Sequence, residues 1–219
     1  MPAGEAPAGA NREVNMATDY KRVIRNLFDF FDFSGRTVVA VGAGGGQLIE
    51  YGRPAAKVFA VDQNPAALAV LGERLEPAGL ADKFVLVHAA FLDFRQRADV
   101  VLFEFCLHEM SDPSAALAHA RALAPAVVVM DHWPGSEWAF MTAEEDKATA
   151  AWAAVVSGLP EKIVSFEASQ VFENFEELWQ KVHGQGEKSL ARIARFKDHS
   201  DITIPMSYGF ALLAAPSPV

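Results

Sequence analysis

Residues 38–52, VVAVGAGGGQLIEYG, constrain the fold of this chain more than any other stretch. β-branched apolar residues lead into four glycines within five positions, and an apolar-periodic run follows. β-branched residues favour strands, whereas glycine accepts backbone conformations that other residues avoid. The pattern predicts a buried strand that turns sharply into a helix beginning near Gln47.

The alternation of strand and helix recurs up to residue 132. An amphipathic helix is expected over residues 20–31, with Thr18 or Asp19 as its cap. Continuous apolar runs joined by helices favour parallel strands that are covered on both faces. The sequence therefore predicts a doubly wound α/β sandwich. The expected strands are 36–42, 57–62, 83–89, 99–105 and 126–132, and the expected intervening helices are 64–79 and 113–124.

The last third of the chain has a different pattern. Thr142 and Glu145 have the spacing of a capping box for a helix that continues to residue 159. We expect a strand over 162–172, helices over 174–182 and 188–196, and one or two strands over 201–215. Since neither an internal repeat nor a linker is visible, residues 18–219 are expected to form one domain. Residues 1–17 are predicted to be a disordered tail without a secretory signal.

Composition limits the class of partner. The 219 residues include 19 basic and 28 acidic side chains, so the net charge of −9 opposes binding to nucleic acid or to anionic membranes. No run approaches the ~18 apolar residues of a membrane span. The single cysteine, Cys106, excludes an intrachain disulfide and lies in an apolar run. We expect a soluble, cytoplasmic protein whose Cys106 is a core residue. Aromatic residues between Trp152 and Trp179 allow a homodimer, although a helical cover explains them as well.

The glycine turn is the expected ligand site. Ligands of open parallel sheets bind beyond the carboxyl ends of the strands, where the first strand-to-helix turn comes closest to them. Asp62 ends the second strand, from which a carboxylate can bind the diol of a ribose. A nucleoside-containing cofactor is therefore expected. The third glycine of the dinucleotide fingerprint is replaced by Gln47, which disfavours a pyrophosphate and hence an NAD-dependent oxidoreductase.

Three segments in this order, VGAGGGQ, VFAVDQNPAAL and DVVLFEFCLHEMSDP, resemble the class I S-adenosylmethionine-dependent methyltransferases. The resemblance spans roughly residues 36–131, and the late segment IPMSYGFALLAA resembles the closing antiparallel strand of that family. It implies a Rossmann-like, mostly parallel seven-stranded sheet with an antiparallel last strand. It also implies S-adenosylmethionine as the cofactor and methyl transfer as the reaction.

The resemblance assigns roles to the glycines and to the strand ends. Glycines of the turn would pack against the methionine part of the cofactor, Asp62 would bind both ribose hydroxyls, and residues 88–94 would flank the adenine. The implied cofactor-binding set is Gly42, Ala43, Gly44, Gly46, Asp62, Gln63, Ala90, Phe91 and Glu104.

The sequence departs from the family pattern in two places. Ala40 stands where an acidic residue commonly lies, so Glu104 is our expected partner for the cofactor's ammonium group. Ala89 or Ala90 stands where another carboxylate is usual, and Asp93 or backbone groups are the expected replacement. If neither replacement works, the chain would be a non-catalytic cofactor-binding or partner-binding member of the fold.

Candidate catalytic residues follow the fourth and fifth strands. His132 is the first candidate for a general base because it lies at the expected mouth of the site and is expected to titrate near neutral pH. His108 is the second candidate, or else it shapes the turn. Asp131 is expected to orient the His132 imidazole or to cap the loop, and Glu109 to be a helix-start or solvent carboxylate.

The acceptor is predicted mainly by exclusion. The motif typical of enzymes that methylate amino groups of bases is absent after the fourth strand, which favours a small organic acceptor, aromatic or amphipathic, methylated at oxygen or nitrogen. Apolar walls for it are offered by Phe103, Phe105, Trp133 and Trp138, of which Phe103 and Phe105 are expected to share one face of the fourth strand. No metal site is expected, because only Asp131 and Glu104 fit a carboxylate cluster and the histidines lack zinc-like spacing.

Overall fold

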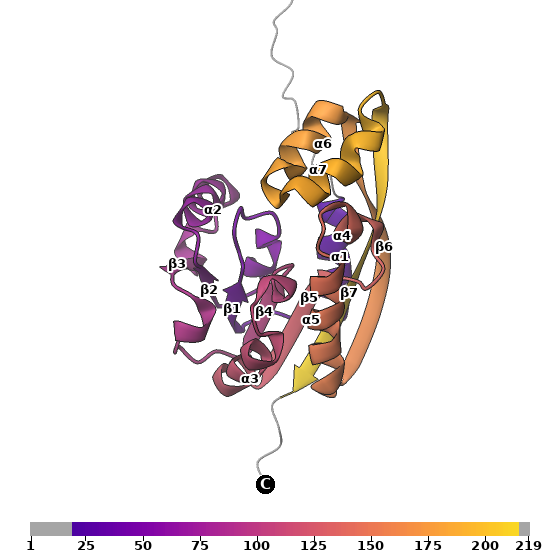
Figure 1. Cartoon of the computed structure of the whole chain (residues 1–219). Helices are drawn as coiled ribbons and strands as arrows, with labels where there is room; N and C mark the ends of the chain where they lie inside the picture. The colour runs from indigo at the N-terminus through magenta and orange to yellow at the C-terminus, as the bar shows by residue number, and fades with distance from the viewer. Residues whose placement is uncertain (1–18, 215–219) are drawn as a thin grey trace, which may run out of the picture.

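The computed structural model, which describes residues 19–214, holds a seven-stranded sheet in the order β3-β2-β1-β4-β5-β7-β6 (Figure 1). β1 to β5 are parallel, and β7 runs antiparallel to both β5 and β6. The predicted doubly wound, mostly parallel sheet is thus confirmed, whereas the predicted tail lies outside the described residues. The strands are β1 (Thr37–Val41), β2 (Lys57–Asp62), β3 (Phe84–His88), β4 (Val100–Glu104), β5 (Ala126–His132), β6 (Lys162–Asn174) and β7 (Ser200–Ala214).

Helices cover both faces of the sheet. Asp19 caps α1 by accepting a hydrogen bond from the backbone of Arg22, and Asn64 with Pro65 begins α2. None of the helices within residues 19–214 is long and apolar enough to cross a bilayer. The α-helices are α1 (Tyr20–Phe30), α2 (Pro65–Ala78), α3 (Pro113–Leu123), α4 (Glu137–Met141), α5 (Glu145–Ser157), α6 (Phe175–Val182) and α7 (Glu187–Ile193). Short 3-10 helices are η1 (Ile49–Gly52), η2 (Ala81–Lys83), η3 (Phe91–Asp93), η4 (Leu107–Glu109), η5 (His183–Gln185) and η6 (Ala194–Phe196).

The alternation of side chains along β1 divides the core into two layers. Val38 and Ala40 pack in the cluster that includes α1 and α2, whereas Val39 and Val41 pack in the cluster that includes α3 and α5. Successive residues of a strand point to opposite faces, so an unbroken apolar strand fills both layers. β1 and β4 are neighbours whose following connections leave toward opposite layers. A ligand crevice is expected where these connections separate.

The prediction of a helix beginning near Gln47 is wrong. In its place the chain forms only the four-residue η1. Gly45 and Gly46 have φ angles of 77° and 61°, which an α-helix does not accept, and Pro54 follows η1 closely. Between these two glycines and Pro54 only residues 47–53 remain, and they form a single 3-10 turn in place of a regular helix.

The predicted capping box at Thr142 and Glu145 is also wrong. Ala143 takes a left-handed conformation (φ 61°) just after the end of α4. Glu144 is therefore the N-cap residue of α5. The hydroxyl of Thr142 donates to a carboxylate oxygen of Glu144 at 2.8 Å. Glu145 instead pairs with Arg192 of α7 at 2.6 Å. The turn between α4 and α5 therefore buries Glu144 and directs Glu145 outward.

The long hairpin of β6 and β7 extends the sheet beyond β5. β5 pairs with Tyr208–Ala214 of β7, and the preceding residues of β7 pair with β6 alone. The chain between these strands forms α6 and α7, which lie beyond the carboxyl ends of the parallel strands (Figure 1). This arrangement covers the edge at which β1 and β4 end.

Gly209 joins this hairpin to the β5 end. A Cβ added at Gly209 would lie 2.5 Å from Cε3 of Trp133 and 2.6 Å from Cζ2 of Trp152. The indole N–H of Trp152 also donates to the carbonyl of His132 at 2.7 Å. The missing side chain at Gly209 thus lets two indoles pack where β5 ends.

We expect Gly209→Ala to lower the free energy of unfolding by about 1–3 kcal/mol, as overpacked sites commonly do. Gly184→Ala is the matched control, because nothing lies within 4 Å of the added Cβ. Its expected effect is within about 0.5 kcal/mol. Urea denaturation of both variants measures the difference, and equal stabilities would contradict the tight contact at Gly209.

Candidate active site

Two cavities flank the ends of β1 and β4, and Gly42 and Phe105 line both of them. The Asp62 cavity, of about 510 Å³, lies toward β2 and β3. The His132 cavity, of about 160 Å³, lies toward β5, β6 and α6. The residues of the glycine turn and of the β4 end therefore separate two chambers of one crevice.

Gly42 is held against Cys106 at the boundary between the cavities. Its φ is 70°, and an added Cβ would lie 2.5 Å from the Cβ of Cys106. The Cys106 thiol donates to the carbonyl of Val41 at 3.1 Å, and burial raises the pKa of this thiol well above its usual range. Cys106 is thus a protonated packing residue, as its apolar surroundings in the sequence indicate.

The backbone reverses handedness at Phe105. With a φ of 50°, Phe105 leaves the plane of β4, so the prediction that Phe103 and Phe105 share one strand face is wrong. Phe103 is buried against Phe91 in the layer of α3. Phe105 turns toward the ring of His132, with 5.1 Å between centroids. Left-handed conformations are costly for bulky residues, and such strain is concentrated at functional sites.

The Asp62 cavity has the features of a nucleoside site. Asp62 lines it, and one of its carboxylate oxygens accepts a hydrogen bond from the backbone of Asn64 at 2.8 Å. A Cβ at Gly44 would lie 2.8 Å from the other oxygen, so any residue other than glycine would displace this carboxylate. The cavity is also lined by the predicted Gln63, Ala90 and Phe91, and by Ala89 and Leu92.

Three of the residues that the sequence assigned to the cofactor site line neither cavity. Gly46 packs against α2, where an added Cβ would lie 2.8 Å from Cδ1 of Leu71. Ala43 is buried in the same core layer. Asp93, the expected replacement for a carboxylate after β3, is exposed in η3. Ala89 and Ala90, and not Asp93, line the Asp62 cavity after β3.

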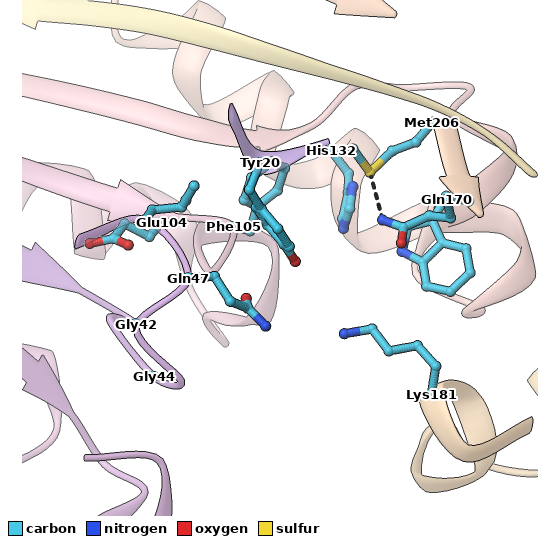
Figure 2. Close-up of a pocket in the computed structure, with 12 residues that line it drawn as sticks. Tyr20, Gly42, Gly44, Gln47, Glu104, Phe105, His132, Gln170, Lys181 and Met206 are labelled. Carbon is cyan, nitrogen blue, oxygen red and sulfur yellow. Dashed lines mark hydrogen bonds between the residues drawn. The ribbon is translucent and has the colours of Figure 1, made fainter. Parts of the chain in front are cut away.

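Glu104 is a partly buried carboxyl group that lines the His132 cavity together with Gly44 and Gln47 (Figure 2). Burial raises its pKa to about 7, against the lowering effect of a hydrogen bond that the phenol of Tyr51 donates to it. Within residues 19–214 no basic side chain forms an ion pair with Glu104. Tyr51 lies on η1 and has no sequence signal that predicts this contact.

Asp131 orients His108 and not His132. An oxygen of Asp131 lies 2.5 Å from Nδ1 of His108, and its carboxylate also accepts the backbone N–H groups of His108 and His132 at 2.9 and 2.8 Å. Burial lowers the pKa of His108, but the Asp131 hydrogen bond and the carboxylates of Glu109 and Glu144 raise it to about 11. His108 lines neither cavity. The expectation that Asp131 orients the imidazole of His132 is therefore wrong.

His132 is the one predicted catalytic residue that lines a cavity in the described part of the chain. Burial lowers its pKa to about 4, so the expectation of titration near neutral pH is wrong. Its imidazole is neutral at pH 7, and its buried Nδ1 has no hydrogen-bond partner among the described residues. A base this weak is poorly matched to proton abstraction near neutral pH.

Polar groups from the last third of the chain complete the His132 cavity. The side-chain nitrogen of Gln170 donates to the sulfur of Met206 at 3.1 Å, and its buried carbonyl oxygen has no partner among residues 19–214. The ammonium group of Lys181 points into the same cavity (Figure 2), where burial lowers its pKa. Trp138 forms an apolar wall, as predicted. These residues lie far from the glycine turn in sequence, so no local motif predicts them.

These features define a class of protein. A doubly wound sheet with a glycine turn after β1, a carboxylate at the end of β2 and cavities at the point where the connections separate is a nucleotide- or nucleoside-binding fold. The site lies beyond the carboxyl ends of the strands, as that fold requires.

Solved structures share this fold at low sequence identity. A candidate methyltransferase from Bacillus halodurans superposes with a TM-score of 0.68, at 14% identity over 89% of this chain and 99% of that one. An S-adenosylmethionine-dependent methyltransferase from Aquifex aeolicus gives a TM-score of 0.54, at 17% identity over 90% and 91% of the two chains. Magnesium protoporphyrin IX methyltransferase from Synechocystis, solved with bound S-adenosylmethionine, gives 0.54 at 13% identity over 88% and 77%.

The sequence comparisons point to the same kind of domain. Residues 39–129 match the family model of a methyltransferase domain. A short stretch of 43 residues is 49% identical to the ribosomal RNA small subunit methyltransferase H of Bifidobacterium adolescentis, over 20% of this chain but only 12% of that protein. The family-model match and the shared fold together support an S-adenosylmethionine-dependent methyltransferase domain.

The residues present fit this cofactor. Gly42 and Gly44 let Cys106 and Asp62 pack against the turn, and Asp62 keeps a carboxylate oxygen beside Gly44 for the ribose. Glu104 offers a partly buried acceptor for an ammonium group, because its own hydrogen-bond donor, Tyr51, is neutral. Glu104 on the neighbouring strand is thus our candidate for the negative charge that Ala40 lacks.

We expect Glu104→Gln to weaken S-adenosylmethionine binding by about 1.5–3 kcal/mol, the usual contribution of a charged hydrogen bond. Since the pKa of free Glu104 is about 7 and a cation lowers it, binding below pH 7 releases a proton from this group. The affinity of the wild type should therefore rise with pH and level off above 7, and Glu104→Gln should lose this dependence.

Calorimetric titrations at pH values on both sides of 7 measure both effects. Glu161→Gln, at an exposed position, is the matched control and should behave as the wild type does. An unchanged affinity and pH profile in Glu104→Gln would remove Glu104 from the cofactor site.

Proposed function

We propose that the protein methylates an oxygen or nitrogen atom of a small organic acceptor that carries an anionic group. The observation that carries this proposal is that the unpartnered carbonyl of Gln170 and the Lys181 ammonium group line one cavity, together with Glu104. The Gln170 carbonyl oxygen is buried without a partner, which is costly in a folded protein, whereas Lys181 is an exposed residue whose ammonium group points into the cavity. A ligand with a hydrogen-bond donor would satisfy Gln170, and its anionic group would pair with Lys181.

The shape of the His132 cavity supports a small acceptor. Its volume is about 160 Å³, and Glu104, the expected partner of the cofactor's ammonium group, also lines it, so only a small acceptor fits beside the cofactor. Phe105 and Trp138 offer aromatic walls that pack against a planar acceptor and exclude water. A nucleic-acid acceptor is opposed by the net charge of −9.

The side chains of the cavity would act by positioning. When bound, S-adenosylmethionine supplies an electrophilic methyl group on a sulfonium whose leaving group is neutral. Lys181 would hold the anionic end of the acceptor, and the carbonyl of Gln170 would accept a hydrogen bond from it. The neutral imidazole of His132 would accept a hydrogen bond from the reacting hydroxyl or amine. Such alignment accounts for a large share of the rate enhancement in two-substrate reactions.

Calorimetric titration with S-adenosylmethionine, S-adenosylhomocysteine and NAD tests the cofactor site on which the proposal rests. The two sulfur compounds should bind in the micromolar range, NAD should not compete with them, and Asp62→Ala should weaken both. Asp82→Ala is the matched control, since Asp82 is an exposed residue on η2 outside both cavities. Preferential binding of NAD would overturn the proposal.

Lys181→Met tests the predicted charge of the acceptor. Small aromatic acids and their methyl esters or amides are supplied as acceptors, and formation of S-adenosylhomocysteine is followed by mass spectrometry. Acids should be the better substrates, and Lys181→Met should raise their KM by roughly 10- to 150-fold, equivalent to the loss of a charged hydrogen bond. The exposed Lys197→Met is the control. Equal use of acids and neutral analogues by the wild type would contradict an anionic acceptor.

A further inference from the structure

Three buried side chains from distant parts of the sequence meet beside the His132 cavity. His108 of η4, His132 at the end of β5 and Glu144 in the turn before α5 each present one donor atom, and these atoms lie within 4.8 Å of one another. All three residues are less than 9% exposed. Two imidazoles and one carboxylate are a donor set that binds zinc and related divalent metals.

His108 and Glu144 are each held by a hydrogen bond at one atom, and each has a second atom that could bind a metal. Asp131 binds Nδ1 of His108, so Nε2 faces Glu144, whose Oε1 lies 3.7 Å away. The hydroxyl of Thr142 donates to Oε2 of Glu144, which leaves Oε1 for another partner. A carboxylate behind a histidine and a donor behind a carboxylate are the outer contacts that orient metal ligands in proteins.

The third side chain supplies an independent observation. Nδ1 of His132 is buried and has no hydrogen-bond partner among the described residues. Its ring lies 5.3 Å from the ring of His108, measured between centroids. An imidazole nitrogen buried without a partner is costly. A neutral imidazole is the form that binds a metal, so binding at His108 would displace the proton that the surrounding carboxylates hold on its ring.

The distances within the cluster fit a metal better than hydrogen bonds. Nε2 of His108 lies 3.7 Å from Oε1 of Glu144 and 3.6 Å from Oε1 of Glu109, both too long for a hydrogen bond. Ligands held ~2.0–2.1 Å from a tetrahedral zinc ion lie roughly 3.4 Å apart, so the pair His108 and Glu144 needs only a small adjustment. The donor atom of His132, within 4.8 Å of the other two, would move closer to them on binding.

We propose that His108, His132 and Glu144 bind a divalent first-row transition metal, with zinc the ion that the donor set fits best. Glu109, whose side chain is half-exposed, is the nearest further oxygen ligand. Because His132 also lines the cavity proposed for the acceptor, the metal would border that cavity. With its acceptor nitrogen on the metal, His132 would donate its remaining ring N–H toward the acceptor, whereas the metal-free imidazole accepts a hydrogen bond. This inference does not depend on the proposed acceptor, since metal binding is measured without cofactor or substrate.

The test is a titration of chelator-treated, full-length protein with Zn²⁺ against a chromophoric chelator, and with Co²⁺ followed by its visible absorption. One metal per chain should bind, with the visible spectrum of nitrogen- and oxygen-bound cobalt of low coordination number. His132→Ala and Glu144→Gln should each weaken zinc binding at least ~10–100-fold, the effect usual for an outer contact, and Asp131→Asn by about that amount. His199→Ala, an exposed histidine, is the matched control.

Circular dichroism and thermal unfolding show whether each variant folds. If His132→Ala does not fold, Glu144→Gln still tests the proposal, because glutamine has nearly the same shape as glutamate. A Zn²⁺ affinity in Glu144→Gln equal to that of the wild type would overturn the proposal. Failure of the wild type to bind either metal would also overturn it, and would mean that a protonated His108 alone neutralises the surrounding carboxylates. Neither result depends on whether methyl transfer is observed.

Discussion

The close approach of two turns at the centre of the sheet determines the rest of the site. β1 and β4 are neighbours, and their connections diverge, so the Gly42 turn and the Phe105 turn meet where the strands end. Gly42 has no Cβ because Cys106 occupies that space, and Phe105 takes a left-handed backbone that directs its ring toward His132. Without this contact the crevice would be one open groove. With it, the crevice consists of two chambers with different chemistry.

The chamber beyond β4 and β5 collects buried ionisable groups. Asp131 and Glu144 are buried and Glu104 is partly buried, and each is held by a specific donor: His108, Thr142 and Tyr51. Burying a carboxylate is expensive unless hydrogen bonds or charges compensate it. Such groups cost stability that an apolar core would not, so their concentration at one end of the sheet is typical of a functional site.

The fold could be predicted from the sequence because its strands are buried on both faces and read as continuous apolar runs. The site could be predicted only where it is local: Asp62 and the glycines lie in one segment, and all of them fall within the region matched by the family model. Gln170, Lys181 and Glu144 escaped prediction because a hairpin and a turn far along the chain bring them to the site. The error at Asp131 has the same origin. Its neighbour in sequence is His132, but the turn after β4 brings His108 within hydrogen-bond distance.

The missing helix after the glycine turn also bears on the choice of cofactor. A regular helix there would direct several free N–H groups and a partial positive charge at the ligand, as a pyrophosphate requires. η1 has only four residues, and its tight course buries Tyr51, whose phenol reaches Glu104. The turn is therefore flanked by two carboxyl groups, Asp62 and Glu104, and the charge of Asp62 disfavours the ionised form of Glu104. A cofactor with an ammonium and a sulfonium charge relieves this repulsion, whereas one with two phosphates would add to it.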